Sequence, residues 1–353
     1  MSDAKPHPMV YNAIHSCNLR QEPRYTTGGT MKSRSSMLVL VSLAGMCVAT
    51  AAQEYPVKPV RIVAPFAAGG ATDVLTRVAS VKLTERWGQS VIVDNRVGAS
   101  GNIGAELVAK LSAPDGYTLL MAGAPHTIGV SLFKNLRYDL EKDLVAIANV
   151  ATFSSVIVVH PSLPAKNVKE LVALAKARPG QLNFGSPNIG SPNHLGMELF
   201  ASMANINMVH IPYKGGSGQM VGDLLAGHVQ LASVGFPPAI PQIKNGKLRP
   251  IAVTGLTRSA LLPEVPTVDE SGLRGYEVSS WYGLFGPAAL PKEIVNKVSA
   301  DVLAFLNAPD FKERLATLGA EPAPMKPDEF ARYVHADILK WAKVVKASGA
   351  KAE

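Results

Sequence analysis

Short apolar runs alternate with longer amphipathic segments from residue 57 onward. Runs of about four to eight apolar and β-branched residues are typical of buried strands, whereas an apolar residue at every third or fourth position is typical of a helix. The strand-like runs are VRIVA, SVIVD, YTLLMAG, SSVIVVH, QLNFGS, MVHIPY, VQLASVG and RPIAVTG. Helices are expected between them, at residues 73–86, 103–111, 168–177, 192–204 and 218–226. This alternation predicts an α/β fold with largely parallel sheets.

The C-terminal segment, residues 294–353, is expected to be helical. Its apolar residues recur at spacings of three and four, in the order Phe330, Tyr333, Val334, Ile338, Trp341 and Val345. Such a stripe is typical of a face that packs against a core. We therefore interpret it as a packing face and not as a binding site.

Residues 1–52 have a different pattern from the rest of the chain. Lys32 and Arg34 precede the apolar run MLVLVSLAGMCV, and the small residues of ATAAQ follow it. This order of basic, apolar and small residues is typical of a secretory signal peptide, and the run is too short to span a bilayer comfortably. We expect export to the periplasm and cleavage near residue 52, with either Met1 or Met31 as the start.

Cysteine and charge narrow the possible chemistry. Both cysteines, Cys17 and Cys47, precede the expected cleavage point, so the processed chain would have no disulfide, no thiolate nucleophile and no cysteine metal site. The net charge is +8, but Lys and Arg are scattered, with no basic tract and no alternation with aromatic residues. Nucleic acid is therefore not an expected partner.

Gly and Ser collect where an expected strand meets an expected helix. PFAAGGATD, at residues 65–73, lies between VRIVA and a helical segment, and GASGNIGAE at 98–106 has the same character. A helix N-terminus offers N–H groups without partners and a partial positive charge, and glycine lets a ligand approach the backbone. PFAAGGATD could thus hold a carboxylate or phosphate without Arg or Lys. A tight turn with glycines chosen for packing is the alternative, and the residues alone leave both open.

Enzyme motifs give little support to catalysis. Walker A, G-x-S-x-G and HExxH are absent, and the glycines of GASGNIG do not match G-x-G-x-x-G. His194 and His210 lack the spacing of metal ligands, which favours a structural or hydrogen-bonding role. We expect no metal, no cofactor and no catalytic residue. The rival is a secreted α/β hydrolase that uses Ser186, Ser191 and His194, although Ser191 suits a helix N-cap better and no orienting acid is evident.

Eight segments, in order, carry a resemblance to a known family. They are YPVKPVRIVAPFAAGGATDVLTR, VIVDNRVGASGNIGAELVAK, APDGYTLLMAG, FGSPNIGSPNHLGMELF, VHIPYKGGSGQMVGDLLAGHV, LRPIAVTG, LPEVPTVDESG and SSWYGLFGPAALP. From about Tyr55 to the C-terminus the chain resembles the periplasmic solute receptors of the tripartite tricarboxylate transporter family, also called Bug receptors. Each segment alone is weak, but their common order is specific.

The resemblance implies a fold and a function. The fold would be a two-lobed periplasmic-binding-protein fold (type II, Venus flytrap), with lobe 1 at residues 55–152 plus 255–353 and lobe 2 at 153–254. Two hinge crossings would fall near residues 154–159 and 251–254. The protein would be a monomer that binds a small carboxylate and delivers it to the permease subunits of a membrane transporter. A receptor that presents its ligand to a sensor kinase is an alternative that the sequence leaves open.

The resemblance also implies ligand contacts, which come from both lobes. Lobe 1 would contribute Phe66, Ala67, Gly69, Gly70, Thr72 and Asp73. Lobe 2 would contribute Ser186, Gly190, Ser191 and His194, with Tyr213, Lys214 and Gly215 nearby. Asp73 favours the helix dipole but would repel a carboxylate, so it either meets a donor on the ligand or caps the turn. Residues 124–127 and 236–238 would tune the far end of the ligand.

Overall fold

The computed structural model describes residues 55–213 and 216–351. The expected signal peptide at residues 1–52, Lys214 and Gly215 lie outside this part. Among the described residues, no helix combines the length and the apolar character that a membrane span requires.

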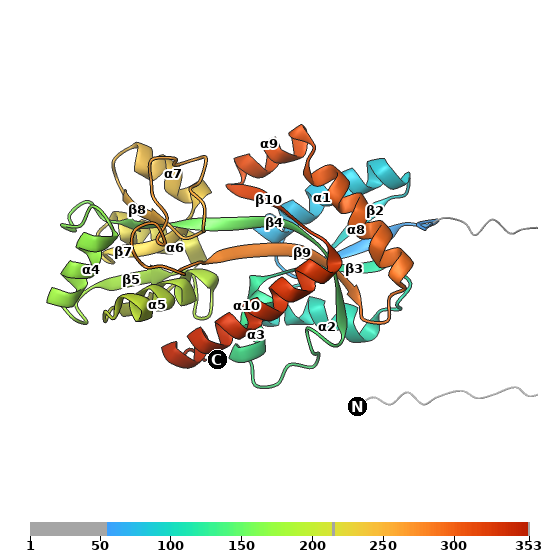
Figure 1. The fold of residues 1–353 in the computed structure, drawn as a ribbon, viewed down its shortest axis with the longest axis horizontal. Coiled ribbons are helices and arrows are strands. Elements are labelled where there is room, and N and C mark those ends of the chain that lie inside the picture. Colours follow the sequence, from blue (N-terminus) through green and yellow to red (C-terminus); the bar gives the residue numbers. More distant parts are fainter. Residues whose placement is uncertain (1–54, 214–215, 352–353) are drawn as a thin grey trace, which may run out of the picture. The chain divides into compact units, whose positions relative to one another are not determined.

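Strands and helices alternate along most of the chain, as the hydrophobic pattern predicts (Figure 1). The strands are β1 (Val60–Ala64), β2 (Val91–Asn95), β3 (Thr118–Gly123), β4 (Leu144–Val159), β5 (Asn183–Ser186), β6 (Val209–Pro212), β7 (Leu231–Gly235), β8 (Arg249–Val253), β9 (Ser279–Pro287) and β10 (Ala320–Met325). The helices are α1 (Ala71–Trp87), the 3-10 helix η1 (Ala99–Gly101), α2 (Asn102–Leu111), α3 (Ala124–Leu132), α4 (Val168–Ala177), α5 (Pro192–Ala204), α6 (Gly216–Leu225), α7 (Phe236–Lys244), α8 (Lys292–Leu306), α9 (Pro309–Thr317) and α10 (Pro327–Ser348).

Two sheets share the long strand β4. The strand order is β2-β1-β3-β9-β4-β7-β5-β6, and β8 and β10 also pair with β4. Residues 144–154 of β4 pair with β9, and residues 155–159 pair with β7. We call the elements around β1, β2, β3, β9 and β10 lobe 1, and those around β5, β6, β7 and β8 lobe 2. The chain therefore crosses between lobes within β4.

Strand direction departs from the expectation of largely parallel sheets. The outer strands are parallel, since β1 pairs with β2 and β3, and β5 pairs with β6 and β7. In the described part of the chain, every antiparallel pair includes β4 or β9. The expectation of a purely helical C-terminal segment is also wrong, because β10 lies between α9 and α10 and pairs with β4.

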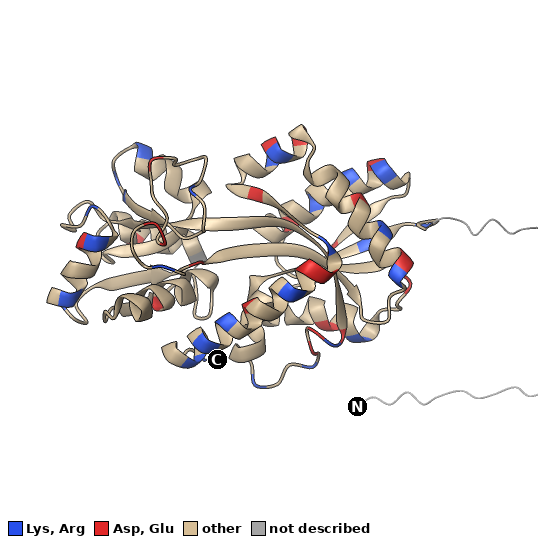
Figure 2. Cartoon of the chain, in the orientation of Figure 1, with Lys and Arg blue, Asp and Glu red and all other residues tan. Residues whose placement is uncertain are grey.

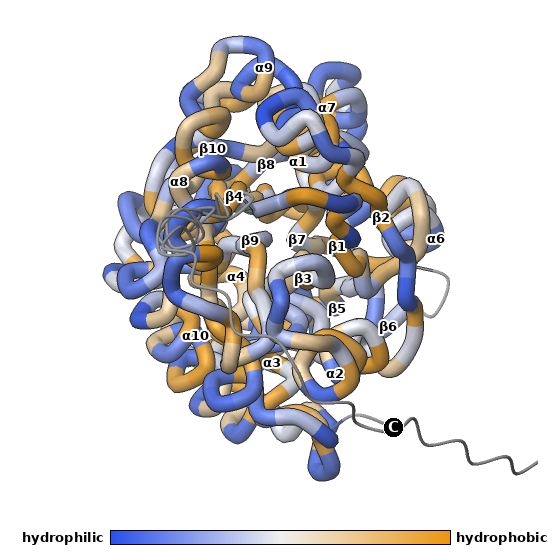
Figure 3. Tube along the Cα trace, turned by 90° about the vertical axis from the view of Figure 1, so that its right-hand side faces the viewer, coloured by the Kyte–Doolittle hydropathy of each residue, from blue (hydrophilic) through white to orange (hydrophobic). Residues whose placement is uncertain are grey.

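Each lobe is a sheet covered by helices on both faces. In lobe 1, α1, α8 and α9 bury their apolar residues on one face, and α2 with the first half of α10 covers the other. In lobe 2, α4 and α5 cover one face, and α6 and α7 cover the other. Hydrophobic residues concentrate along β1 and β9, whereas the outer loops are hydrophilic (Figure 3). Lys and Arg are interspersed with Asp and Glu over the helices of both lobes (Figure 2).

Helix α10 contributes to the cores of both lobes. Its first half adds Phe330 and Val334 to the core of lobe 1. Its second half adds Trp341 and Val345 to the core of lobe 2. The predicted packing stripe is thus confirmed, and the same stripe serves two cores.

A buried carboxylate on α10 fixes this helix to its neighbours. Asp337 Oδ2 accepts hydrogen bonds from Thr127 Oγ1 (2.7 Å) on α3 and from Trp281 Nε1 (2.9 Å) on β9. Lys340 Nζ lies 2.9 Å from Asp337 Oδ1 and 2.8 Å from Glu277 Oε2. A buried carboxylate is tolerated when it is paired and hydrogen-bonded, so the network holds α10 across the junction of the lobes.

The segment between β8 and β9 packs with lobe 2. Leu262 and Val265 join the core beneath α6 and α7, and Val268 joins the core beneath α4 and α5. Tyr276 Oη donates to the carbonyl of Gly196 on α5 (3.1 Å). The chain returns to lobe 1 at the start of β9, where Ser279 pairs with Ser154 of β4.

Candidate ligand-binding site

The loop between β1 and α1 presents bare backbone at the start of a helix. The N–H of Gly70 donates to the carbonyl of Ala67 (3.2 Å) and closes the loop. The first bond within the helix runs from the N–H of Val74 to the carbonyl of Gly70 (3.0 Å). Within the described part of the chain, the N–H groups of residues 71–73 have no hydrogen-bond partner. Phe66 is half-buried and Ala67 is exposed, so this loop offers donors to a ligand.

Asp73 holds the loop in this shape from beneath. Its side chain is 2% exposed and accepts from the N–H of Gly69 (2.9 Å) and from Arg77 Nε (2.9 Å). Asn95 Nδ2, at the end of β2, donates to Asp73 Oδ1 (3.0 Å) and to the carbonyl of Phe66 (3.0 Å). The carboxylate therefore accepts hydrogen bonds from three donors, and all three belong to lobe 1. Of the two roles that the sequence leaves open, the geometry supports capping of the turn.

The charge of Asp73 is balanced within lobe 1. Burial alone would raise the pKa of this carboxyl, but the hydrogen bonds from Arg77, Gly69 and Asn95 outweigh burial and hold its pKa below the ordinary value. Asp73 is thus ionised at neutral pH and paired with Arg77. Its charge is offset before any anion approaches the start of α1.

Two other strand-to-helix junctions pack against this loop. Residues 98–101 all have positive φ angles, and this turn brings Gly101 against Phe66 and His126. The ring of His126, at the start of α3, lies edge-on to Phe66 with 6.0 Å between centroids. His126 is 0% exposed, and burial lowers its pKa to about 4. A neutral imidazole therefore supports the loop at physiological pH.

Thr72 connects the start of α1 to the strand that returns from lobe 2. It is buried, and its side chain faces Tyr282 of β9. Burial raises the pKa of Tyr282, so this phenol stays neutral. The contact is outside the reach of sequence reasoning because the two residues come from distant elements.

In lobe 2 the loop between β5 and α5 is held by its own side chains. Ser191 caps α5, as predicted, since its Oγ accepts from the N–H of His194 (3.2 Å). The hydroxyls of Ser186 and Ser191 both donate to the carbonyl of Asn188 (2.9 Å each). His194 Nδ1 accepts from the N–H of Gly190 (3.0 Å). The side chains of Ser186 and His194 are buried, whereas Asn188 is exposed on the outer side of the loop.

Gly190 brings this loop into contact with lobe 1. Its φ is +76°, a conformation that favours glycine. A Cβ placed on Gly190 would collide with Leu132 Cδ2, at the end of α3. The positive φ angle and the contact with Leu132 therefore favour glycine at this close approach of the two lobes.

Tyr213 belongs to the same region, and Lys214 and Gly215 lie outside the described residues. The N–H of Tyr213 donates to the carbonyl of Ser186 (2.9 Å), which ties the ends of β5 and β6 together. Its phenol is buried and donates to Asp223 Oδ2 (2.9 Å) on α6. Burial and then the neighbouring carboxylate raise the pKa of Tyr213 to about 12.

The geometry gives no support to the hydrolase reading. Ser191 Oγ is engaged as an N-cap, and Ser186 Oγ is 0% exposed. The ring nitrogen near Ser186 is Nε2 of His210 (2.6 Å), not a nitrogen of His194. Because the Ser186 hydroxyl donates to Asn188, it accepts from His210, so His210 is placed as a donor to the serine and not as its base.

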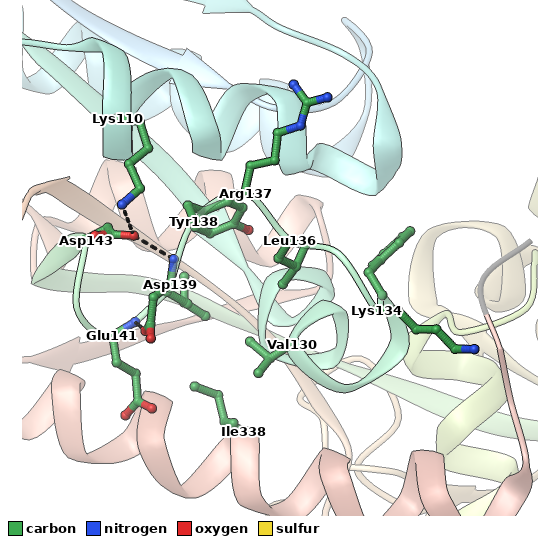
Figure 4. A pocket seen from close by; sticks show the side chains of 12 residues that line it. Lys110, Val130, Lys134, Leu136, Arg137, Tyr138, Asp139, Glu141, Asp143 and Ile338 are labelled. Atoms are coloured by element: carbon green, nitrogen blue, oxygen red, sulfur yellow. Dashed lines mark hydrogen bonds and ion pairs between the residues drawn. The ribbon is translucent and has the colours of Figure 1, made fainter.

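A separate cavity of about 530 Å³ lies on lobe 1 among α2, α3 and α10 (Figure 4). None of the expected ligand contacts lines it. Its carboxylates are already paired: Asp143 Oδ2 lies 2.7 Å from Lys110 Nζ, and Glu141 Oε1 lies 2.8 Å from His335 Nδ1. This arrangement is less suited to an anion than the start of α1. The described residues also contain no cluster of side chains suited to a metal ion.

The fold defines a class of protein, and the comparisons define the family. The architecture is that of two-lobed periplasmic solute-binding proteins, with which solved structures align over most of the chain. A sequence model described as the tripartite tricarboxylate transporter family receptor matches residues 75–350. The chain belongs to this family.

Relatives of this chain include a Bug protein and two structures solved with a dicarboxylate. It is 36% identical to protein BugT of Bordetella pertussis over 315 residues, which are 89% of this chain and 96% of that protein. It is similar to a solved structure of R. palustris Rpa4515 with adipate, at 37% identity and a TM-score of 0.72, covering 84% of this chain and 99% of the other. MatC from Rhodopseudomonas palustris with bound malate aligns at 30% identity and a TM-score of 0.67, covering 82% and 100%.

Proposed function

We propose that this protein is a periplasmic receptor that binds a small carboxylate-bearing metabolite and delivers it to a tripartite membrane transporter. The observation that carries the proposal is the start of α1, where the N–H groups of residues 71–73 are without partners in the described structure. The ion pair with Arg77 offsets the negative charge of Asp73, which lies close to these N–H groups. Two related receptors were solved with the dicarboxylates adipate and malate.

The proposed chemistry accounts for a useful affinity without an ion pair to the ligand. A Kd of about 1 μM corresponds to about −8.2 kcal/mol. A hydrogen bond to a charged group contributes roughly 1.5–3 kcal/mol, and a helix N-terminus adds about 0.3–2 kcal/mol. Four or five such donors would reach this affinity after the cost of association. Residues 66–72 and the outer side of the loop at 187–191 would supply them, while Asp73, Ser186, Gly190 and His194 shape the loops.

We propose binding without catalysis, by a monomer and with no cofactor. The buried position of Ser186 and the N-cap role of Ser191 support this proposal. So do the names of the relatives, which describe receptors and binding proteins.

Ligand trapping would follow from closure of the lobes about their crossings. We place these crossings near residues 154–155 of β4 and at the start of β9, and we assign residues 256–278 to lobe 2. The packing of this segment against α5 and β8 supports the boundary. Small-angle scattering should show compaction on binding, and unchanged dimensions at saturation would contradict closure.

A thermal-stability screen tests the function directly. The panel would contain adipate, malate, other di- and tricarboxylates, amino acids and aromatic acids, with the matching diols and amides as uncharged controls. A ligand present at a hundred times its Kd adds about 2.7 kcal/mol to the free energy of unfolding, which shifts the melting temperature clearly. If no acid in the panel raises it, or if a diol does so equally, carboxylate recognition is wrong. N-terminal sequencing of the exported protein should begin near Ala52 or Gln53.

A further inference from the structure

Two histidine rings support the loop of lobe 2 from its inner side. His210, on β6, places Nε2 2.6 Å from Ser186 Oγ, at the first residue of the loop. His194, on α5, accepts the N–H of Gly190 at Nδ1 (3.0 Å), near the loop's last residue. The loop at residues 186–191 is therefore held at both ends by imidazole nitrogens.

The two rings lie against each other. Their centroids are 3.7 Å apart, with 21° between the ring planes. Phe184 of β5 stacks on His210 at 5.0 Å and buries that side of the pair. Elements distant in the sequence thus bring the two histidines into one stack behind the loop.

The hydrogen bonds determine where the ring protons lie. His194 Nδ1 accepts from Gly190, so a neutral His194 carries its proton on Nε2. Ser186 donates to the carbonyl of Asn188 and accepts from His210, so His210 also carries a proton on Nε2.

We propose that His194 and His210 position the loop at 186–191 for the ligand, His210 by donating to Ser186 and His194 by accepting from Gly190. The positioning role toward the ligand rests on the proposed function. The shape of the loop itself depends only on the hydrogen bonds of the free protein, so the two can be tested apart.

The charged groups around the histidine pair lie on α5 and α6 of the described structure. Glu198, one turn along α5, places Oε1 3.6 Å from His194 Nε2. On α6, Asp223 accepts a hydrogen bond from Tyr213, and its other carboxylate oxygen lies 3.4 Å from His228 Nδ1. Strand β5 presents Phe184, which does not titrate. Burial, and then the neighbouring His194, lower the pKa of His210 to about 4, so His210 is a neutral donor to Ser186 at physiological pH.

Nuclear magnetic resonance of the ligand-free protein tests the loop. With ¹⁵N-labelled histidine, His210 should carry its proton on Nε2 at pH 7. The amide signals of Asn188 and Gly190 should shift in His210→Phe and stay in place in His228→Gln. A proton of His210 on Nδ1, or unchanged loop amides in His210→Phe, would overturn the proposal.

Two substitutions of one histidine test the link to binding, with adipate as the probe at pH 7.5. His210→Phe keeps an aromatic ring but removes the donor to Ser186, and should weaken binding about tenfold. His210→Gln restores a neutral N–H donor near the position of Nε2 and should stay within about threefold of the wild type. The control is His228→Gln, an exposed histidine paired with Asp223, which should leave Kd unchanged.

Equal losses in His210→Phe and His210→Gln would show a merely structural role and overturn the proposal. If the wild type binds neither adipate nor any other acid of the panel, the choice of ligand class in the proposed function is contradicted. The resonance experiment still decides whether the histidine pair positions the loop.

Discussion

The two loops proposed to hold the ligand differ in the chemistry that supports them. In lobe 1 an ionised carboxylate, Asp73, gathers donors from Gly69, Arg77 and Asn95. In lobe 2 a stacked pair of histidines takes the same place. Both supports lie on the inner side of a strand-to-helix junction and leave the outer backbone open. One support is an ionised carboxylate, and the other includes His210, whose pKa burial lowers to about 4.

The difference shows that either a carboxylate or a pair of histidines can shape a backbone site for anions, provided that neighbouring groups offset any charge on the supporting side chain. Asp73 is tolerated near an anion because Arg77 and the hydrogen bonds from Gly69 and Asn95 offset its charge. His210 avoids the problem because burial lowers its pKa to about 4, so this ring is uncharged at neutral pH. The predictions below separate the two loops, beginning with the largest expected effect.

The backbone loop of lobe 1 should be the most sensitive point. Gly70→Val would place a branched side chain beside the free N–H groups at the start of α1, where its Cβ lies 3.2 Å from the carbonyl of Ala67. We expect binding of the acid found in the stability screen to weaken by at least about a hundredfold. The backbone at Gly70, with φ of −75°, is open to other residues, so the protein should stay folded.

Calorimetric titration measures this loss, and circular dichroism checks the fold. Gly222→Val is the matched control, since a Cβ at this exposed glycine of α6 meets nothing within 4 Å. Retained binding in Gly70→Val would show that the ligand does not approach this backbone.

Lowering the pH should reduce the free energy of unfolding through buried His126 before it does so through Asp73. The pKa of buried His126 is about 4 in the folded protein and about 6.5 when unfolded. The unfolded chain therefore takes up the proton first, and stability falls as the pH drops from 6.5 towards 4. A pKa difference of one corresponds to about 1.4 kcal/mol, so His126 alone should account for a loss on the order of 3 kcal/mol. Asp73, whose pKa is lowered, contributes stability that is lost only as the pH falls below about 4.

Urea unfolding at a series of pH values checks these windows. His126→Asn keeps an acceptor for the N–H of Gly123 without titrating in this range, so the slope between pH 6.5 and 4 should decrease. An unchanged slope would mean that His126 is not held neutral by the fold.

The support of lobe 1 should depend on the carboxylate more than on its cation. Asp73→Ala leaves the N–H of Gly69 and the amide of Asn95 without their acceptor, and should lower the free energy of unfolding by about 1–3 kcal/mol. Arg77→Ala removes a side chain that is 54% exposed, so its cost should stay below about 1 kcal/mol. Urea denaturation of both variants gives the ranking, and the reverse order would identify the ion pair as the main support.

The contact of lobe 2 with lobe 1 should give a smaller effect. Gly190→Ala introduces a Cβ at a positive φ angle and against Leu132, and should destabilise the protein by about 1–2 kcal/mol. In the double variant with Leu132→Ala, the steric part should be relieved, which appears as a coupling energy in a double-mutant cycle. Strict additivity would place the whole cost in the backbone angle.

Features that depend on a few neighbouring residues, such as a strand or a helix cap, could be predicted from the sequence. The strand VRIVA coincides with β1, and Ser191 caps α5 with Pro192 as its first residue. The pairing of Asp73 with Arg77, four residues apart on one helix, is also of the kind that spacing reveals.

Contacts between distant segments were beyond this reasoning. His210 meets Ser186 only because β5 and β6 pair in a particular register. Asn95 reaches Asp73 because β2 lies beside β1. The full length of β4 and the return through β9 were missed because their apolar runs are interrupted by small and polar residues without a clear period of two.

The position of α10 has a consequence for the order of folding. Phe330 and Val334 complete the core of lobe 1, while Trp341 and Val345 complete the core of lobe 2. Of the described elements this helix is synthesised last, so both cores lack one of their layers until α10 is available. Removal of α10 should therefore abolish the folding of both lobes together instead of leaving one intact.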